Sequence, residues 1–328
     1  MKIAWHTWEP GLTSNNMKTS SGGALWMRYL FDELSTEGHQ VSWVSDEKVS
    51  ISRVGTVSYA NAAKQCDVLF APWRWAMPSY PERNELYARQ MGLIAQFAKA
   101  DKPVMIHDQD HKISEGDENY LKTIGAQVYE PSFYPRDGVR TLHFPQNLEK
   151  INNPLSNRPV DLAYVGNNYE RFDQVCQLVG GDFSDFRIKF YGNWLDPNPG
   201  RQTPDEVKAA LPCVTFMGRL PQQQTQTALS MAAATIHFCK ESYSEHGFVT
   251  FRWAEAAAAG TIPLIPFGFA LPALWQMAFW DLGLMVSNSE DVKDTLRNRA
   301  KIYDEAIRLS RKFVHRYMSI GHWLNLFE

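Results

Sequence analysis

Two charged side chains, Arg252 and Glu255, lie three positions apart in a stretch that is otherwise apolar and rich in alanine. In a helix, this spacing places both side chains on one face. A guanidinium can neutralise a diphosphate, and a carboxylate can accept hydrogen bonds from the hydroxyls of a ribose. The pair therefore predicts a nucleoside-diphosphate site. The alternative is an ion pair on a solvent-exposed helix face, which would contribute only about 0.3–0.5 kcal/mol.

The residues around this pair form a pattern that is typical of a helix followed by a buried strand. Residues 248–259 are good helix formers without proline, and Gly260 follows where a left-handed C-cap is expected. Residues 261–267 are a short apolar run, which is typical of a buried parallel strand and its exit. The helix should therefore end at Gly260 and feed directly into a sheet.

A second group of chemically capable residues, His107, Asp108, Asp110 and His111, follows an apolar strand predicted at 103–106. Ligands of open α/β sheets bind just outside the carboxyl ends of the strands, so either carboxylate could act as a general base. Two other interpretations remain open. The carboxylates could cap the next helix, or the two histidines could belong to a metal site.

Three glycine-containing turns in the second half of the chain follow predicted strands. They contain Gly166, Asn167 and Asn168; Gly192 and Asn193; and Gly218, Arg219 and Leu220. Glycines give a ligand access to backbone N–H groups, and a helix N-terminus favours an anion. Together with the start of the helix that carries Arg252, these turns predict a site for a nucleotide diphosphate.

Strands and helices alternate along both halves of the chain, which is typical of doubly wound α/β domains. The first half opens with a strand at 1–5, and a polar loop follows that ends in Ser21, Gly22 and Gly23. This loop is not a G-x-G-x-x-G fingerprint, although its glycines would let a ligand approach the backbone closely.

A proline- and asparagine-rich stretch at 140–159 is the candidate linker between two domains. We predict a first domain at 1–150, a second domain at 151–310, and a C-terminal helix at 311–328 that packs back toward the first domain.

Composition restricts the class of protein. The chain has 328 residues, of which 44% are apolar and 21% are charged, as in globular proteins. It contains neither a long apolar run nor a signal-peptide pattern at its start, and its scattered cysteines are typical of buried reduced thiols. We therefore expect a cytoplasmic monomer. The net charge of -3 indicates that any contact with nucleic acid must use a local patch.

Several of these segments resemble the two-domain glycosyltransferases of the GT-B fold, and more narrowly the bacteriophage DNA β-glucosyltransferases. The resemblance covers most of the chain and is strongest from 161 to 265, where DLAYVGNNYER, FYGN, VTFMGRLP and FVTFRWAEAAAAGTIPLI match segments of the donor site. It implies two Rossmann-like domains facing a cleft and a UDP-sugar donor, with UDP-glucose as the default. Arg252 would then bind the diphosphate, Glu255 the ribose, and Arg171 would be a further diphosphate ligand.

The same resemblance implies how the reaction would proceed. Asp108 falls where the family has its catalytic aspartate, with Asp110 and the more distant His6 as alternative bases. Retaining GT-B enzymes have a second glutamate eight positions before the one on the helix, and that position here is Gly247. The resemblance therefore implies an inverting enzyme. A divalent ion could assist, although no pair of carboxylates at a suitable position marks a metal site.

If the resemblance extends to the acceptor, that acceptor is a 5-hydroxymethylpyrimidine in phage DNA, flipped out of the duplex, and the protein would act in the host cytoplasm. The acceptor side would include Ser21, Gly22 and Gly23, together with Trp73, Arg74 and Trp75, an arginine between two aromatic rings. These aromatic residues could instead form a buried cluster. Two other functions remain open: a GT-B transferase for a polysaccharide, lipid or small molecule, and a nucleotide-sugar epimerase or binder.

Overall fold

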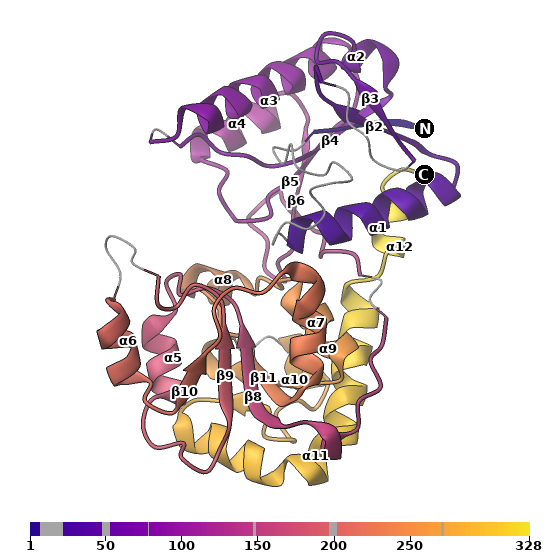
Figure 1. Cartoon of the computed structure of the whole chain (residues 1–328). Helices are drawn as coiled ribbons and strands as arrows, with labels where there is room; N and C mark the ends of the chain where they lie inside the picture. The colour runs from indigo at the N-terminus through magenta and orange to yellow at the C-terminus, as the bar shows by residue number, and fades with distance from the viewer. Residues whose placement is uncertain (7–21, 48–52, 78, 147–148, 197–201, 270–271) are drawn as a thin grey trace. The chain divides into compact units, whose positions relative to one another are not determined.

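The computed structural model describes residues 1–6, 22–47, 53–77, 79–146, 149–196, 202–269 and 272–328. The chain divides into two compact units, drawn in Figure 1. Unit 1 comprises Met1–Pro145 and Ile320–Glu328, and unit 2 comprises Gln146–Ser319. Each unit is built on its own parallel sheet.

The sheet of unit 1 has the strand order β3-β2-β1-β4-β5-β6-β7, and all its neighbouring strands are parallel. Its strands are β1 (Lys2–Trp5), β2 (Gln40–Val44), β3 (Val54–Val57), β4 (Val68–Pro72), β5 (Val104–His107), β6 (Gln127–Glu130) and β7 (Arg140–Thr141). The strand order reverses between β1 and β4, which makes that position the topological switch point, where doubly wound folds bind ligands.

The helices of unit 1 are α1 (Gly22–Thr36), α2 (Ala62–Gln65), α3 (Pro81–Lys99), α4 (Glu115–Thr123) and, from the end of the chain, α12 (Gly321–Leu324). Proline at the start of α3 needs no N–H partner there, and the Ser114 side chain caps α4 by accepting from the Asp117 N–H.

The core of unit 1 is rich in aromatic rings. Trp5 stacks on Phe70 with the ring centroids 4.5 Å apart, and the ring centroids of Trp26 and Trp323 are 5.2 Å apart. The Trp323 indole N–H donates to the His143 carbonyl at 2.7 Å. Residues from the end of the chain therefore help to complete the core of the first unit.

The sheet of unit 2 repeats the same topology, with the order β10-β9-β8-β11-β12-β13. Its strands are β8 (Val160–Val165), β9 (Ile188–Tyr191), β10 (Val214–Phe216), β11 (Ala232–Ile236), β12 (Ile262–Pro266) and β13 (Met285–Val286). Here the switch point lies between β8 and β11, which pair in parallel.

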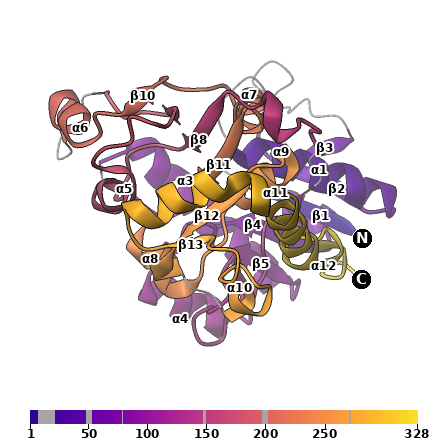
Figure 2. The same cartoon turned by 90° about the horizontal axis from the view of Figure 1, so that it is seen from below.

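Helices cover the sheet of unit 2. They are η1 (Leu155–Asn157), α5 (Phe172–Val179), α6 (Pro204–Ala210), α7 (Gln222–Ser230), α8 (Glu241–His246), α9 (Arg252–Ala259), η2 (Phe267–Phe269), α10 (Pro272–Gln276) and α11 (Ser289–Tyr317). α7 packs on α9, β8 and β11, and the long α11 packs on α5, α9 and β12. Figure 2 shows α11 lying across the strands of unit 2.

The sequence predicts the two doubly wound sheets, and the structure confirms both. Some boundaries differ. Arg140 and Thr141, expected in the linker, form the edge strand β7 of unit 1, and the expected domain boundary at 310 falls inside α11. The helix expected from Phe248 begins only at Arg252, because Gly247 is left-handed (φ 60°) and ends a separate helix, α8, that the sequence pattern did not indicate.

The described residues contain no helix with the length and apolar character needed to span a membrane. The cysteines are free: Cys66 and Cys239 are buried, as expected, whereas Cys176 and Cys213 are only half-buried.

Three fully buried histidines of unit 1 predict that the protein loses stability in weak acid. Burial lowers the pKa of His6 to about 3 and the pKa values of His107 and His143 to about 4. In the unfolded chain a histidine takes up its proton near pH 6.5. The unfolded state therefore binds more protons than the folded state between about pH 6.5 and 4, and stability falls as the pH falls through that window.

Urea denaturation from pH 8 to pH 5 measures this effect. We expect a loss on the order of 1.4 kcal/mol per pH unit for each such histidine, beginning below about pH 6.5. The variant His107→Gln should show a shallower slope than the parent protein. A midpoint that does not change between pH 7 and pH 5 would contradict the prediction.

Candidate functional site

The start of α9 carries the pair that the sequence indicates. The Arg252 guanidinium donates to the Glu255 carboxylate, and the two side chains share one face of the helix, as predicted. The Glu255 side chain is only 3% exposed, whereas Arg252 is 36% exposed. The interpretation as an ion pair on a solvated face is therefore wrong, because α9 is buried from Trp253 to Ala259.

The sequence of α9 explains why the helix can be buried so completely. Alanines at 256–259 let it pack closely against α7 and α11, and Gly260, left-handed at φ 63°, ends it as predicted. The Thr261 hydroxyl then donates to the Leu229 carbonyl at 2.8 Å. The C-terminal end of α9 is thus fixed, and its N-terminal end presents Arg252.

The glycine-containing turns after β8, β9 and β10 lie side by side because these strands are neighbours in the sheet. The Asn167 side-chain oxygen accepts from the Asn193 N–H at 2.8 Å, and the Gly192 N–H donates to the Gly218 carbonyl at 2.7 Å. Arg219 donates to the Asn193 side chain. The expected convergence of these turns is present, and hydrogen bonds hold it together.

At two positions in these turns, a side chain would displace a neighbouring group. A Cβ on Gly192 would lie 2.2 Å from the Gly166 carbonyl oxygen, and a Cβ on Gly166 would lie 2.3 Å from the Tyr164 hydroxyl. Gly192 also has a φ of 130°, a conformation that other residues rarely adopt. The close approach of the β8 and β9 turns therefore depends on the absence of a side chain.

Arg171 precedes α5 at the rim of the same region. One of its terminal nitrogens donates to the Tyr164 hydroxyl at 3.0 Å and to the Asn167 carbonyl at 3.2 Å. Its buried Nε has no hydrogen-bond partner among the described residues. A second guanidinium is thus oriented beside the β8 turn, with a donor left over.

A cavity of about 290 Å³ opens at the carboxyl ends of β8 and β11, at the switch point of unit 2. Four of the predicted residues, Gly166, Asn167, Arg171 and Arg252, line it. The other predicted donor residues lie around these four. Asn168 is buried and bonded to Gln202, and Glu255 is bonded to Arg252. The hydrogen-bonded turns contain Gly192, Asn193, Gly218 and Arg219, and Leu220 follows them and is half-buried.

Sequence reasoning missed several residues of the cavity, above all His237. This histidine follows β11 and stacks on Trp253, with ring centroids 4.5 Å apart and an angle of 6° between the planes. Its Nε2 is buried without a partner among the described residues, and burial together with the nearby Arg252 lowers its pKa to about 3. The cavity thus combines two cations with a neutral imidazole. A histidine directly after a buried strand was the available signal.

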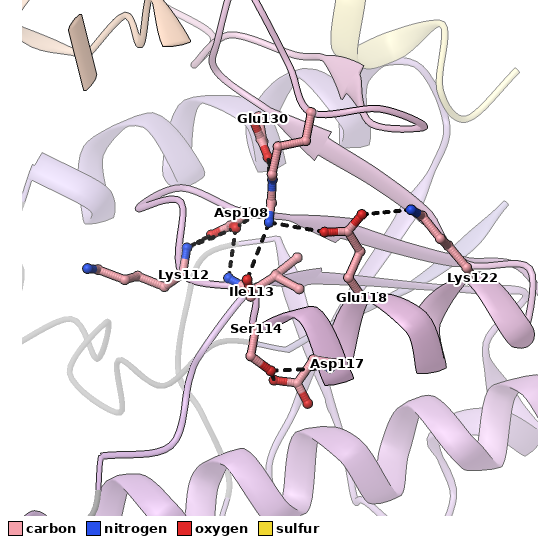
Figure 3. Close-up of polar contacts among 9 residues, drawn as sticks. Asp108, Lys112, Ile113, Ser114, Asp117, Glu118, Lys122 and Glu130 are labelled. Carbon is pink, nitrogen blue, oxygen red and sulfur yellow. Dashed lines mark hydrogen bonds and ion pairs between the residues drawn. The ribbon is translucent and has the colours of Figure 1, made fainter. Parts of the chain in front are cut away.

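In unit 1, Asp108 follows β5 as predicted, and its side chain is only 1% exposed. Figure 3 shows the carboxylate against the backbone of Lys112 and Ile113, whose N–H groups donate to it at 2.9 and 3.0 Å. Burial raises the pKa of Asp108, while these hydrogen bonds and Arg136 oppose the rise. The cap of α4 is Ser114, so the helix-capping interpretation of Asp108 is wrong.

Asp110 and His111 lie on the same turn and are half-buried. His107 belongs to β5, and its Nε2 bonds to the Leu142 carbonyl at 2.8 Å. Among the described residues, no group of three His, Cys, Asp or Glu side chains could hold a metal ion. The turn after β5 therefore presents carboxylates, without a ligand set for a metal.

The predicted acceptor side is only partly accessible. Trp73 is 1% exposed and belongs to the core of unit 1, so its ring offers no surface for stacking, and that expectation is wrong. Arg74 is also buried, and its guanidinium donates to the Trp73 carbonyl at 3.4 Å, while Trp75 is half-buried. Gly22 and Gly23 begin α1, and Ser21 lies outside the described residues.

His6, the alternative base, is fully buried after β1 and contacts the Tyr59 hydroxyl at 3.0 Å. Its position at the switch point of unit 1 fits a ligand site, but its pKa of about 3 makes it a weak proton acceptor near pH 7.

No protein-family model matches the chain, and no curated protein matches its sequence. Solved structures do match. A T4 phage β-glucosyltransferase has a TM-score of 0.67 and 15% identity over 100% of this chain and 98% of its own. An α-glucosyltransferase in complex with UDP and a 13-mer DNA has a TM-score of 0.59 and 13% identity over 98% of this chain and 97% of its own.

A third match is AviGT4, a glycosyltransferase involved in avilamycin A biosynthesis, with a TM-score of 0.58 and 13% identity over 99% of this chain and 95% of its own. At such low identity these matches establish the fold. The chain has the two-domain GT-B fold, as the sequence predicts.

The contact between the β8 and β9 turns predicts unequal costs for two glycine substitutions. Gly218→Ala places a Cβ in open space at a φ of 72° and should cost about 1 kcal/mol. Gly192→Ala adds a clash with the Gly166 carbonyl and should cost about 3 kcal/mol or more. Thermal unfolding should therefore show a drop of about 3 °C for Gly218→Ala and about 10 °C for Gly192→Ala. Equal drops would show that the close approach does not matter.

Proposed function

We propose that the protein is a glycosyltransferase that takes its sugar from a UDP-sugar, with UDP-glucose as the first choice. The observation that carries the proposal is the cavity at the switch point of unit 2, where Arg171 and Arg252 meet a glycine turn and the start of a helix. Two guanidiniums and a helix N-terminus suit a diphosphate. Structures of the same fold have been determined with UDP-glucose, which supports this choice of donor.

Each donor residue has a role that its chemistry allows. Arg252 and Arg171 would neutralise the diphosphate, and the N–H groups of the β8 turn would add hydrogen bonds. Glu255 would accept from the ribose hydroxyls, because the contact with Arg252 holds its carboxylate in place. His237 is neutral, and its Nε2 has no partner among the described residues, so this ring nitrogen can bond to one ligand atom.

The proposed acceptor is a hydroxymethylated pyrimidine base in DNA. Two matched structures support it: one is described as a DNA-modifying enzyme, and the other is bound to a DNA oligonucleotide. A base in a duplex must leave the stack before an enzyme can reach its substituent. The acceptor atom is then an exocyclic hydroxyl oxygen.

The proposed reaction is a single displacement with inversion. The acceptor oxygen attacks the anomeric carbon, and the bond from that carbon to the diphosphate oxygen breaks. Asp108 takes the hydroxyl proton, because its raised pKa makes it a better base than an ordinary carboxylate. Arg252 and Arg171 stabilise the charge that develops on the departing UDP. One matched structure contains UDP with Mn²⁺.

A second acceptor class, a small molecule or glycan, is favoured by two specific observations. The net charge of -3 gives no general attraction to DNA, and Trp73 is unavailable for stacking on a base. AviGT4, which has the same fold, takes part in avilamycin A biosynthesis. The donor half of the proposal is the same in both cases.

Donor binding can be tested without any acceptor. Calorimetry should detect binding of UDP and UDP-glucose, and Arg252→Gln should weaken both about 10- to 100-fold because a charge-assisted hydrogen bond is lost. Arg187→Gln, in an arginine that is 71% exposed, is the matched control and should bind like the parent protein. If UDP-sugars do not bind, the whole proposal fails.

Transfer can be tested by incubating the protein with a panel of UDP-sugars and duplexes that contain 5-hydroxymethylcytosine, 5-hydroxymethyluracil or unmodified bases. Mass analysis of the nucleosides should show one added sugar on a hydroxymethylated base. Asp108→Asn should lower the rate about 100- to 10,000-fold, and Asp110→Asn should lower it much less. Because the base must be ionised, the rate should fall as the pH falls through the raised pKa of Asp108.

The outcomes separate the alternatives. Binding of UDP-glucose without transfer to any duplex would direct the search to glycans and small molecules. Conversion of the UDP-sugar without an acceptor would identify an epimerase. A larger loss of transfer rate in Asp110→Asn than in Asp108→Asn would assign the base to Asp110.

A further inference from the structure

We infer that Arg136 is a positioning residue that holds the turn after β5 and favours the ionised form of the Asp108 carboxylate. The inference rests on the proposed role of Asp108 as the base. Arg136 lies between β6 and β7, well away in sequence from the turn that it contacts. Neither its sequence context nor a motif indicates this role.

The guanidinium of Arg136 contacts three carboxylates that come from three elements. It donates to Asp108 after β5 at 2.9 Å, to Glu130 at the end of β6 at 2.5 Å, and to Glu118 on α4 at 3.4 Å. It also donates to the Ile113 carbonyl at 3.3 Å. Arg136 therefore bonds to the turn that carries Asp108 and Asp110 at both its beginning, Asp108, and its end, Ile113.

The charge balance around Asp108 gives Arg136 its importance. Arg136 pairs with Asp108, Glu118 and Glu130, and Asp110 adds a further negative charge near Asp108 from the same turn. Arg136 is the only cation in this set of described residues. Glu130 is fully buried and Glu118 largely so, which means that solvent does little to weaken these interactions.

Without the guanidinium, a buried carboxylate among other carboxylates would keep its proton. A protonated Asp108 cannot accept the proton of an acceptor hydroxyl. Arg136 would thus act on the rate through the charge and the orientation of Asp108, while leaving the donor cavity of unit 2 unchanged.

The test compares pH–rate profiles of kcat/KM for the parent protein and the variants Arg136→Met, Arg136→Lys and Glu118→Gln. Arg136→Met should shift the acidic limb of the profile to higher pH, by about one pH unit or more. Arg136→Lys should restore part of the shift, because an ammonium keeps the charge but cannot bridge the carboxylates in the same way. Glu118→Gln should shift the acidic limb to lower pH, because it removes a competing negative charge.

Lys122→Met is the matched control. Lys122 pairs with Glu118 at 2.8 Å but is 51% exposed, so its loss should leave the limb in place. UDP-glucose affinity should be equal in all variants. If Arg136→Met does not fold, the opposite shifts of Arg136→Lys and Glu118→Gln decide the matter.

A loss of rate in Arg136→Met that is the same at every pH would overturn the inference and leave Arg136 a structural role only. Titration of the Asp108 carboxylate by ¹³C NMR, assigned with Asp108→Asn, provides a readout that needs no substrate. A pKa of Asp108 that is the same with and without Arg136 would also overturn the inference. Absence of transfer by the parent protein, with an intact titration difference, would instead overturn the proposed function.

Discussion

The position of α9 depends on one buried guanidinium at its far end. Arg158 donates to the Ala259 carbonyl at 3.0 Å, to the Ala232 carbonyl at the start of β11 at 2.7 Å, and to the Asn153 carbonyl at 2.7 Å. The last carbonyls of a helix have no partner within it and carry partial negative charge, so a cation stabilises them there. The helix that presents Arg252 is therefore anchored to the strand that leads to His237. The cavity proposed for the donor is formed between these two anchored elements.

Both proposed sites contain a buried carboxylate that is paired with an arginine. Glu255 and Asp108 are carboxylates removed from water, and an unpaired buried charge would cost several kcal/mol. Each is paired with an arginine, Arg252 or Arg136, that is less buried than the acid itself. Such pairs contribute little net stability, but they fix the position and the charge of a carboxylate. A site that must deliver an ionised carboxylate into a dry environment depends on that property.

The sequence could predict what short-range patterns determine. The spacing of Arg252 and Glu255, the left-handed Gly260 and the strand before Asp108 are local signals, and the structure contains all three. Glycine turns after neighbouring strands of a parallel sheet must also converge. The parts that could not be predicted depend on tertiary contacts. Arg136 reaches Asp108 from a different loop. The sequence after β4 likewise could not indicate that the Trp73 side chain packs into the core.

The same distinction explains why the fold leaves the acceptor open. An enzyme described as modifying DNA and one described as involved in avilamycin A biosynthesis share this architecture, so the architecture alone carries no information about the acceptor. In unit 2 the ligand-facing turns are joined by hydrogen bonds such as that from Asn193 to Asn167, which leaves little freedom to change them separately. In unit 1 the described segments after β4 and β5 lead to two different helices, α3 and α4. Loops that connect the elements of a sheet can change without loss of the core. If the proposed function holds, we therefore expect acceptor choice to reside in the loops of unit 1, while the proposed donor site stays constant.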